Sequence, residues 1–388
     1  MSQQCIFIKL EGDFIDSFIY SGTLFLVHAD SKITTHDWEG LIASALHNNN
    51  QTHGAIFEFL KDCRETAQLT NRDSITIHID KDELEDKCAS TLPLDGWPTD
   101  INIYTNRLYI ASETGVEELP FEWRSRRIEP AGRFHIWRKY AYRVSANDWH
   151  RLAIAAGPNG VVTASPRNGY IKEEDIATLL EIDSHDCEWV GRNLVANSLD
   201  GAFLSTFPEL PKRPQGLLSS SDYWKQLNAI KQQPPETQRV AHKGQNTVVY
   251  AWVAGNKLFS LLSTGELSVE QTNEATGSEQ AERTVNDMDV EIGMGGRFSN
   301  TENVLAARSS LFGTVIEIGD ELCTVSEDGI ETVSTRPVSW RVFSRARNYL
   351  NHLHIIENDQ LFIRAYLPSA IPGQTNRFGI SIEDVLEN

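Results

Sequence analysis

The sequence has few cysteines and no pair of them in the C-x-x-C spacing of zinc sites and redox motifs. An odd, scattered set favours reduced thiols over a disulfide framework, and reduced thiols are typical of the cytoplasm. Long apolar runs are also lacking: no stretch reaches the roughly 18 apolar residues of a membrane helix, and the first residues carry no basic region. We therefore expect a cytoplasmic protein that does not enter a membrane. The cysteines are Cys5, Cys63, Cys88, Cys187 and Cys323.

Catalytic signatures are missing as well. No Gly-x-Ser-x-Gly elbow occurs, and no Gly-Lys-Ser/Thr follows the glycine-rich stretch 293–297 as a P-loop requires. The acidic run Asp80–Asp86 fails the EF-hand pattern, because Glu85 stands where a calcium loop needs glycine, so we expect a solvated loop there. These absences leave no catalytic residue, no metal ligand set and no cofactor to name.

Positive charge is in short supply. The chain has 35 Lys and Arg residues against 54 Asp and Glu residues, which gives a formal net charge of −19. Such a chain repels phosphate backbones, so nucleic-acid binding is disfavoured. With 388 residues, of which 40% are hydrophobic, the chain is long and apolar enough to form a folded core.

What the sequence does contain is a recurring unit of short alternating strands joined by tight turns. In the first copy, Phe14–Tyr20 runs into Leu24–Val27, and Ile33–Thr35 follows after a turn at Ala29–Ser31. Apolar residues that alternate with polar ones between turn residues predict antiparallel strands. Further copies begin near Ile101, Tyr140, Trp189, Val248, Val315 and His352.

The second turns of these units recur every 42 residues or so where nothing is inserted, and about 42 residues is the length of one four-stranded propeller blade. Two turn sequences echo each other, because Ser112-Glu113-Thr114-Gly115 and Ser326-Glu327-Asp328-Gly329 are each followed by a Trp-Arg pair. The interval between the second turns of the first and second copies is twice the length of one repeat. It leaves room for a degenerate blade built from Ala55–Phe59 and Ser74–Ile79.

In these features the chain resembles β-propeller proteins. The architecture is WD40-like, but the tryptophan-aspartate pairs of WD40 blades and the doubled glycine of kelch blades do not repeat. The resemblance implies an all-β fold with a single β-propeller domain over residues 1–388, of about seven blades, with six or eight as alternatives. The strand Cys5–Leu10 should complete the blade that the C-terminal segment begins, because pairing the two removes an exposed sheet edge.

Short helical patterns lie between the units. Asp37 precedes an apolar stripe at helical spacing, and further helices are expected over Glu173–Leu180, Ser221–Ile230 and Thr301–Leu311. The stripe consists of Trp38, Leu41, Ile42, Ala45 and Leu46. Two segments, 208–246 and 270–300, are interpreted as loops inserted into the propeller domain, because they are polar and rich in turn residues.

Two clusters combine arginine with aromatic residues in this acidic chain, one within Glu122–Arg143 and one near the C-terminus. Arginine beside Trp or Tyr is typical of protein-interface hot spots, since both offer large contact areas and arginine binds carboxylates at two points. In the structural alternative, the tryptophans fill cores between blades and the arginines lie over them, solvated or paired with internal acids. The candidate partner-binding residues are Arg124, Arg126, Arg127, Trp137, Arg138, Arg341, Arg345 and Arg347.

His352 and His354 are two residues apart in an expected strand, so both rings point to one face, as metal ligands in a sheet often do. The sequence offers no third ligand. Packing at a blade interface with a hydrogen bond is the alternative for this pair.

Together these observations predict a non-catalytic protein-interaction scaffold, or adaptor subunit, of a cytoplasmic multiprotein complex. Its partners would be one or more proteins, with no membrane, and the propeller itself would be monomeric. Recognition of RNA or single-stranded DNA by the arginine-aromatic clusters is a further class, which the acidic remainder of the chain disfavours. The alternative is a propeller enzyme with a metal or polar site in the central channel, to which His352, His354 and Arg364 would contribute. The fold by itself does not choose between them, because propellers serve many functions.

Overall fold

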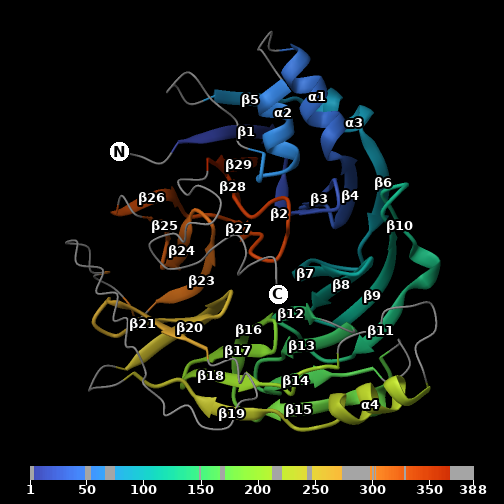
Figure 1. Ribbon diagram of the computed structural model, residues 1–388. Coiled ribbons are helices and arrows are strands. Elements are labelled where there is room, and N and C mark those ends of the chain that lie inside the picture. Colours follow the sequence, from blue (N-terminus) through green and yellow to red (C-terminus); the bar gives the residue numbers. More distant parts are fainter. Residues whose placement is uncertain are drawn as a thin grey trace. The chain divides into compact units, whose positions relative to one another are not determined.

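The computed structural model describes residues 4–48, 54–65, 75–147, 150–166, 171–211, 221–242, 247–272, 298, 301, 303–326 and 329–367. Within these ranges the chain forms short, mostly antiparallel strands and a few short helices (Figure 1). No helix in the described ranges has the length and apolar character that crossing a membrane requires.

In the described residues, seven sheets follow one another along the chain. The first sheet contains β2 (Phe14–Tyr20), β3 (Thr23–His28), β4 (Lys32–Asp37) and β6 (Cys88–Pro93). The second contains β7 (Pro98–Tyr104), β8 (Arg107–Ser112), β9 (Gly115–Glu122) and β10 (Arg127–Ile128), and β11 (Phe134–Trp137) also pairs with β9. The third contains β12 (Arg143–Asn147), β13 (Arg151–Ala155), β14 (Val161–Ala164) and β15 (Ile176–Leu180).

The remaining sheets follow the same order of strands. The fourth contains β16 (Ser184–Val190), β17 (Asn193–Ser198), β18 (Gly201–Thr206) and β19 (Glu236–Arg239), and the fifth contains β20 (Val248–Ala254), β21 (Lys257–Leu262) and β22 (Leu267–Gln271). The sixth contains β23 (Val304–Ser310), β24 (Gly313–Ile318), β25 (Glu321–Ser326) and β26 (Gly329–Thr335). The seventh contains β27 (Ser339–Val342), β28 (His352–Glu357), β29 (Gln360–Tyr366), β1 (Cys5–Glu11) and β5 (Ile75–Ile79).

Seven sheets of this topology are the blades of an all-β, seven-bladed propeller, as the sequence predicted. Six of the seven predicted turns fall between the second and third strands of a sheet, whereas the echoed turn that ends at Gly329 falls between the third and fourth strands of the sixth sheet. The blade repeat can therefore be detected in the sequence wherever a tight hairpin joins two adjacent strands of a sheet.

Strand β1 closes the seventh sheet. It pairs antiparallel with β29, where Ile8 lies opposite Ile363, so the prediction that the N-terminal strand completes the C-terminal blade is confirmed. On its other side β1 pairs parallel with β5, where Ile8 lies opposite Ile77. Ile6, Ile8 and Leu10 are fully buried, which makes β1 an interior strand of this sheet.

The expected degenerate blade is wrong. Ala55–Phe59 lies within a helix, α2 (Gly54–Lys61), and β5 joins the seventh sheet instead of starting one of its own. The apolar residues of α2 recur at helical spacing, and Ile56, Phe59 and Leu60 are its buried side chains. The interval of double length thus holds an insertion between β4 and β6 of the first sheet.

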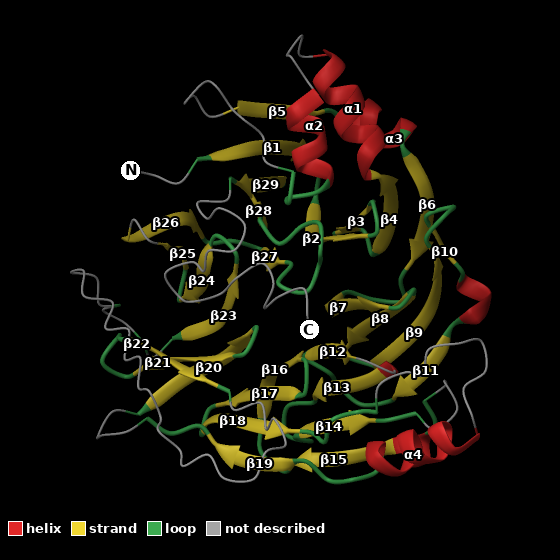
Figure 2. Cartoon of the chain, viewed as in Figure 1, coloured by secondary structure: helices red, strands yellow, loops and turns green. Residues whose placement is uncertain are grey.

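This insertion also holds α1 (Trp38–Asn48) and α3 (Lys81–Asp86), shown in red in Figure 2. The predicted apolar stripe of α1 is buried throughout, at 0–1% exposure. The expectation of a solvated loop over the acidic run is wrong, because α3 occupies it. Asp80 accepts a hydrogen bond from the Glu83 amide at 2.8 Å while the Glu83 carboxylate accepts from the Asp80 amide at 3.2 Å, a capping box that begins this helix.

Of the other predicted helices, the one at Ser221 is confirmed as α4 (Ser221–Lys231). Two are wrong: Glu173–Leu180 holds a short 3-10 turn and then β15, and Thr301–Leu311 holds β23. Their apolar residues fit a helical period, but pairing with β14 and β24 decides their structure. Segment 208–246 contains α4 and β19, whereas 270–300 lies outside the described residues apart from 270–272 and 298.

The chain divides into two compact units. Unit 1 consists of Met1–Trp97, Phe121–Pro130 and Trp252–Asn388, and unit 2 consists of Pro98–Pro120 and Ala131–Ala251. The core of unit 1 gathers around β1, β2 and α1, and that of unit 2 lies between the second, third and fourth sheets. A single domain over the whole chain stays a prediction.

Within unit 2, the first strands of neighbouring sheets are joined by hydrogen bonds between a side chain and a backbone amide. The two partners are 44 residues apart in every case, which is one blade repeat. Polar residues in these otherwise buried strands therefore serve to join blades. The bonds run from Val144 N–H to Asp100 Oδ2, from Ala146 N–H to Asn102 Oδ1 and from Trp189 N–H to Ser145 Oγ, at 3.0, 3.4 and 3.0 Å.

Candidate partner-binding surface

The connection between β11 and β12 in unit 2 carries the predicted site residue Arg138, which follows another, Trp137, at the end of β11. We call Arg138–Tyr142 the crossover segment. The Ala141 amide donates to the Ser112 carbonyl at 3.1 Å and the Tyr142 amide donates to the Ala155 carbonyl at 2.8 Å. The Thr99 hydroxyl also donates to the Ala141 carbonyl at 2.5 Å. The backbone of the crossover segment is thus fixed to β7, β8 and β13.

Gly115 allows this backbone to pass close to the turn between β8 and β9. Its φ is +138°, and a Cβ atom there would lie 1.8 Å from the Trp137 carbonyl oxygen. Glycine has no Cβ and adopts positive φ without penalty, so it meets both requirements. The entry to the crossover segment therefore depends on this residue.

We expect Gly115→Ala to lower the free energy of unfolding by about 2–4 kcal/mol, because a methyl group meets a fixed carbonyl as well as an unfavourable φ. Gly329 is the matched control, since it stands at the same place in the echoed turn, has φ +124° and has no described atom within 4 Å of the position that a Cβ would take. Gly329→Ala should cost about 1 kcal/mol. Urea denaturation of both variants measures the difference, and equal losses would contradict the proposed clash.

Two tyrosines project from the crossover segment into solvent. Tyr140 is 36% exposed and Tyr142 is 41% exposed, whereas Ala141 between them is fully buried. Their ring centroids are 4.6 Å apart, so the rings form one continuous aromatic surface. Phe134 on β11 is 45% exposed as well. These rings lie in the predicted cluster, but the sequence analysis did not name them as partner contacts. The signal for their exposure was the alternation of aromatic residues on both sides of the small residue Ala141.

The same segment carries positive charge. Lys139 Nζ lies 5.4 Å from the centroid of the Trp137 ring and donates to Asn159 Oδ1 at 3.3 Å. Arg138 is exposed, and in the described part of the chain neither cation has a carboxylate partner. Of the two predicted residues here, Trp137 is half-buried and its ring contacts the Lys139 ammonium group, whereas Arg138 faces solvent.

The arginines between β9 and β10, in unit 1, have different roles. Arg124 is exposed and lies over the Trp123 ring at 5.3 Å from its centroid, and Arg127 is exposed on β10. Arg126 instead binds Asp37 at 2.9 Å and has φ +56°. The predicted group thus contains two arginines open to a partner and one that holds the turn to the first sheet.

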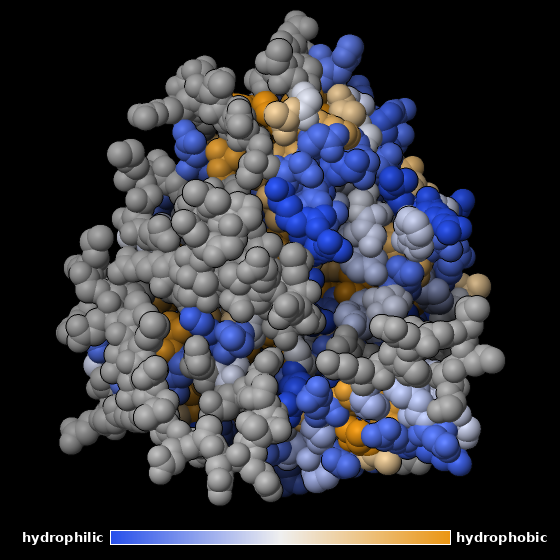
Figure 3. Space-filling view, in the orientation of Figure 1, coloured by the Kyte–Doolittle hydropathy of each residue, from blue (hydrophilic) through white to orange (hydrophobic). Residues whose placement is uncertain are grey.

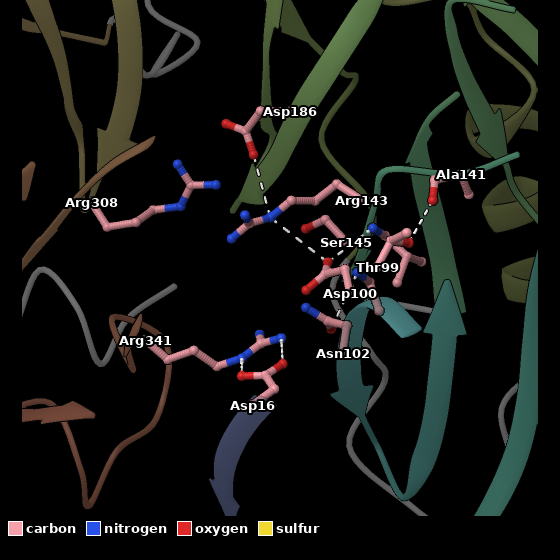
Figure 4. A network of polar contacts seen from close by, with 12 residues as sticks. Asp16, Thr99, Asp100, Asn102, Ala141, Arg143, Ser145, Asp186, Arg308 and Arg341 are labelled. Carbon is pink, nitrogen blue, oxygen red and sulfur yellow. Dashed lines mark hydrogen bonds and ion pairs between the residues drawn. The ribbon is translucent and has the colours of Figure 1, made fainter. Parts of the chain in front are cut away.

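The C-terminal group also contains an arginine that is paired with a carboxylate. Arg341 on β27 binds both carboxylate oxygens of Asp16 on β2, at 2.8 and 2.5 Å, and both side chains are only 15% exposed (Figure 4). This pair joins first strands in unit 1, as the structural alternative anticipated for a paired arginine. Arg345 and Arg347 are exposed.

Unit 2 contains a further arginine between carboxylates that sequence reasoning did not single out. Arg143 Nε lies 3.7 Å from Asp100 Oδ2 and 3.3 Å from Asp186 Oδ1 (Figure 4). Asp186 also accepts hydrogen bonds from Asn197, at 3.2 Å, and from the Tyr250 hydroxyl. Arg143 therefore links a carboxylate of the second sheet with one of the fourth sheet inside unit 2.

The histidine pair is buried in unit 1. His352 and His354 are 0% and 1% exposed, with ring centroids 6.0 Å apart, and His354 Nδ1 shares a hydrogen bond of 2.9 Å with the Ser17 hydroxyl. Burial lowers the pKa of His352 to about 3 and holds that of His354 well below its usual value. In the described ranges, no group of three or more His, Cys, Asp or Glu residues gathers as metal ligands.

Exposed apolar surface is local in this protein. On the face drawn in Figure 3, hydrophobic side chains of the described residues form small areas among hydrophilic ones. Ten large apolar side chains are more than a third exposed in the described ranges, and four of them lie between residues 123 and 142. These are Trp123, Phe134, Tyr140 and Tyr142.

No family model matches the sequence, and no curated protein matches it. Among solved structures, the chain is similar to the β-propeller domain of Cps50 (Swd1) from Myceliophteria thermophila, with 13% identity and a TM-score of 0.37 over 70% of this chain and 97% of that one. It is also similar to the Dos1 propeller, with 8% identity and a TM-score of 0.48 over 91% of this chain and 78% of that one. At these identities the similarity concerns the fold.

Proposed function

We propose that the protein is a non-catalytic scaffold or adaptor that holds one or more protein partners in a cytoplasmic complex. The observation that carries this proposal is the crossover segment of unit 2, where the exposed rings of Tyr140 and Tyr142 lie beside Arg138 and Lys139, two cations without a carboxylate partner among the described residues. Aromatic and arginine side chains supply most of the binding energy at protein interfaces, whereas isolated exposed apolar residues need no explanation.

The internal polar groups support the same proposal. Arg143 and Arg341 each bind carboxylates of neighbouring strands, so these charges stabilise the propeller. The alternative, a propeller enzyme, draws on the histidine pair and Arg364. Arg364 donates to the Val333 carbonyl at 2.9 Å, and both histidines are packed among aromatic rings. Among the described residues, Arg124, Arg127, Arg138 and Lys139 have no carboxylate partner, which favours the scaffold.

Charge reversal of the exposed arginines tests the proposal. Two double variants, Arg124→Glu/Arg127→Glu and Arg345→Glu/Arg347→Glu, are compared with the unmodified full chain in affinity capture from native cells. For at least one variant we expect a captured protein to bind on the order of 30-fold more weakly, because loss of a central arginine contact costs about 2 kcal/mol or more.

The control carries the same charge change at cations that pair with neighbouring carboxylates. Lys81 lies 3.8 Å from Glu85 and Lys172 lies 3.8 Å from Glu174, and both lysines are well exposed. Lys81→Glu/Lys172→Glu should keep full binding. Thermal melts confirm that all variants fold. If every variant, including one in the crossover segment, retains the affinity of the unmodified chain, the scaffold proposal fails.

A further inference from the structure

We propose that the crossover segment recognises an acidic stretch of a partner protein. The inference rests on the proposed function and adds to it the chemistry of the partner. The first observation behind it is a local excess of positive charge. Residues 131–142 contain Arg133, Arg138 and Lys139 but no Asp or Glu, in a chain whose net charge is −19.

Neighbouring acids do not neutralise this segment. Glu117 on β9 lies 3.7 Å from Arg133, which directly precedes β11, and 3.2 Å from His135 on β11. Partial burial raises the pKa of the Tyr140 phenol, and the nearby Tyr142 and Glu113 raise it by smaller amounts. Arg138 and Lys139 have no carboxylate partner among the described residues, so their charges remain available to one supplied from outside.

The segment is also ordered before binding. Three hydrogen bonds fix the backbone of Ala141 and Tyr142, and Gly157 lets the Tyr142 ring lie close, since a Cβ there would be 2.7 Å from Tyr142 Cε2. A rigid tyrosine pair presents contact area at low entropic cost, because little side-chain freedom is lost when a partner binds. Apolar residues of the partner would pack on these rings while its carboxylates meet the cations.

A protein stretch fits this surface better than a nucleic acid does. Rings beside cations also stack on bases, but a nucleic-acid strand brings a continuous run of phosphates near a protein of charge −19. An acidic peptide brings only a few charges. At physiological salt, repulsion by more distant acids is screened beyond about 8 Å, so a local patch of two or three cations is enough for it.

A photo-crosslinking experiment identifies the chemistry of the partner. The full chain carries a benzophenone amino acid in place of Tyr140, and the matched control carries it in place of Trp224, an exposed aromatic residue on α4. After irradiation in native cells, mass spectrometry reads the cross-linked peptide. We expect Tyr140 adducts to be peptides with an excess of Asp and Glu that the control does not capture. Neutral or basic peptides, nucleic acid or lipid at Tyr140 would overturn the inference.

Charge reversal provides the second measurement. In Arg138→Glu/Lys139→Glu, binding of the cross-linked partner should weaken by at least about tenfold at low salt, and the difference should shrink as salt increases. Lys81→Glu/Lys172→Glu is the control of equal charge and should bind normally. A partner that is captured but binds the crossover variant with unchanged affinity overturns this inference alone. If no protein is captured by any version of the chain, the proposed function fails with it.

Discussion

Removal of residues 1–10 is expected to unfold the protein. This deletion takes away β1, which lies between β29 and β5, so two strands lose their hydrogen-bonded neighbour at once. The three fully buried side chains of β1 are lost as well, and each such side chain contributes about 2–5 kcal/mol. The sum approaches or exceeds the total stability of a typical domain, roughly 5–15 kcal/mol.

Point variants test the same strand in a chain that still folds. Ile8→Ala should lower the free energy of unfolding by about 2–5 kcal/mol, measured by urea denaturation, because Ile8 is fully buried between Ile363 and Ile77. Lys9→Ala is the matched control on the other face of the strand. Lys9 is partly exposed and its ammonium group lies 6.0 Å from the Phe362 ring centroid, so its loss should cost less than about 1 kcal/mol.

The opposite outcome is easy to recognise. A truncated chain that is soluble, melts cooperatively and matches the full chain in its circular dichroism spectrum would show that the seventh sheet does not need β1. Equal losses for Ile8→Ala and Lys9→Ala would contradict the assigned faces of the strand.

The second large effect is expected on acidification. Burial lowers the pKa of His36 to about 4 and that of His352 to about 3, from the ordinary value of 6.5. The pKa of His150 is lowered to about 4 by burial and by the nearby positive charges of Arg107 and Lys231. The unfolded chain therefore binds protons between pH 6.5 and these lower values while the folded chain does not.

The sign of the effect follows directly. Protons bound only by the unfolded state stabilise that state, so the free energy of unfolding is highest above pH 6.5 and falls as the pH decreases toward 3–4. His36 and His352 each contribute about 1.4 kcal/mol per pH unit in that interval, or about 2 kcal/mol at pH 5, and the partly buried His150 contributes less because solvent screens it. Several acting together would remove much of the stability of the protein. Urea denaturation at a series of pH values from 8 to 4.5 measures the slope.

One substitution separates His352 from the other groups. In His352→Phe a ring of similar shape remains among Trp38, Tyr349 and His354, but its two nitrogens are gone. The loss of stability between pH 8 and pH 5 should be smaller than in the unmodified chain by about 2 kcal/mol. The measurement at pH 8 serves as the reference, because His352 is neutral there in both states. Parallel pH profiles for the two proteins would contradict the prediction.

Local patterns in the sequence were enough to predict most strands of the propeller. The alternation in Phe14–Tyr20 and the turn at Ala29–Ser31 depend on neighbouring residues, since turn type and strand face are set over a few positions. The stripe of α1 was predicted for the same reason. Predictions were wrong where a segment satisfied two patterns, as in Glu173–Leu180 and Thr301–Leu311, and where pairing with the neighbouring strand of the same sheet chose between them.

The candidate surface shows the same division. The sequence by itself identified the segment between Glu122 and Arg143 as basic and aromatic, because composition is a local property. Only the tertiary structure decided which arginines face solvent, since Arg341 meets Asp16 at a sequence separation of 325 residues and Arg126 meets Asp37. It also placed β5 beside β1. Contacts of this kind depend on which strands become neighbours after folding, and residue type alone does not carry that information.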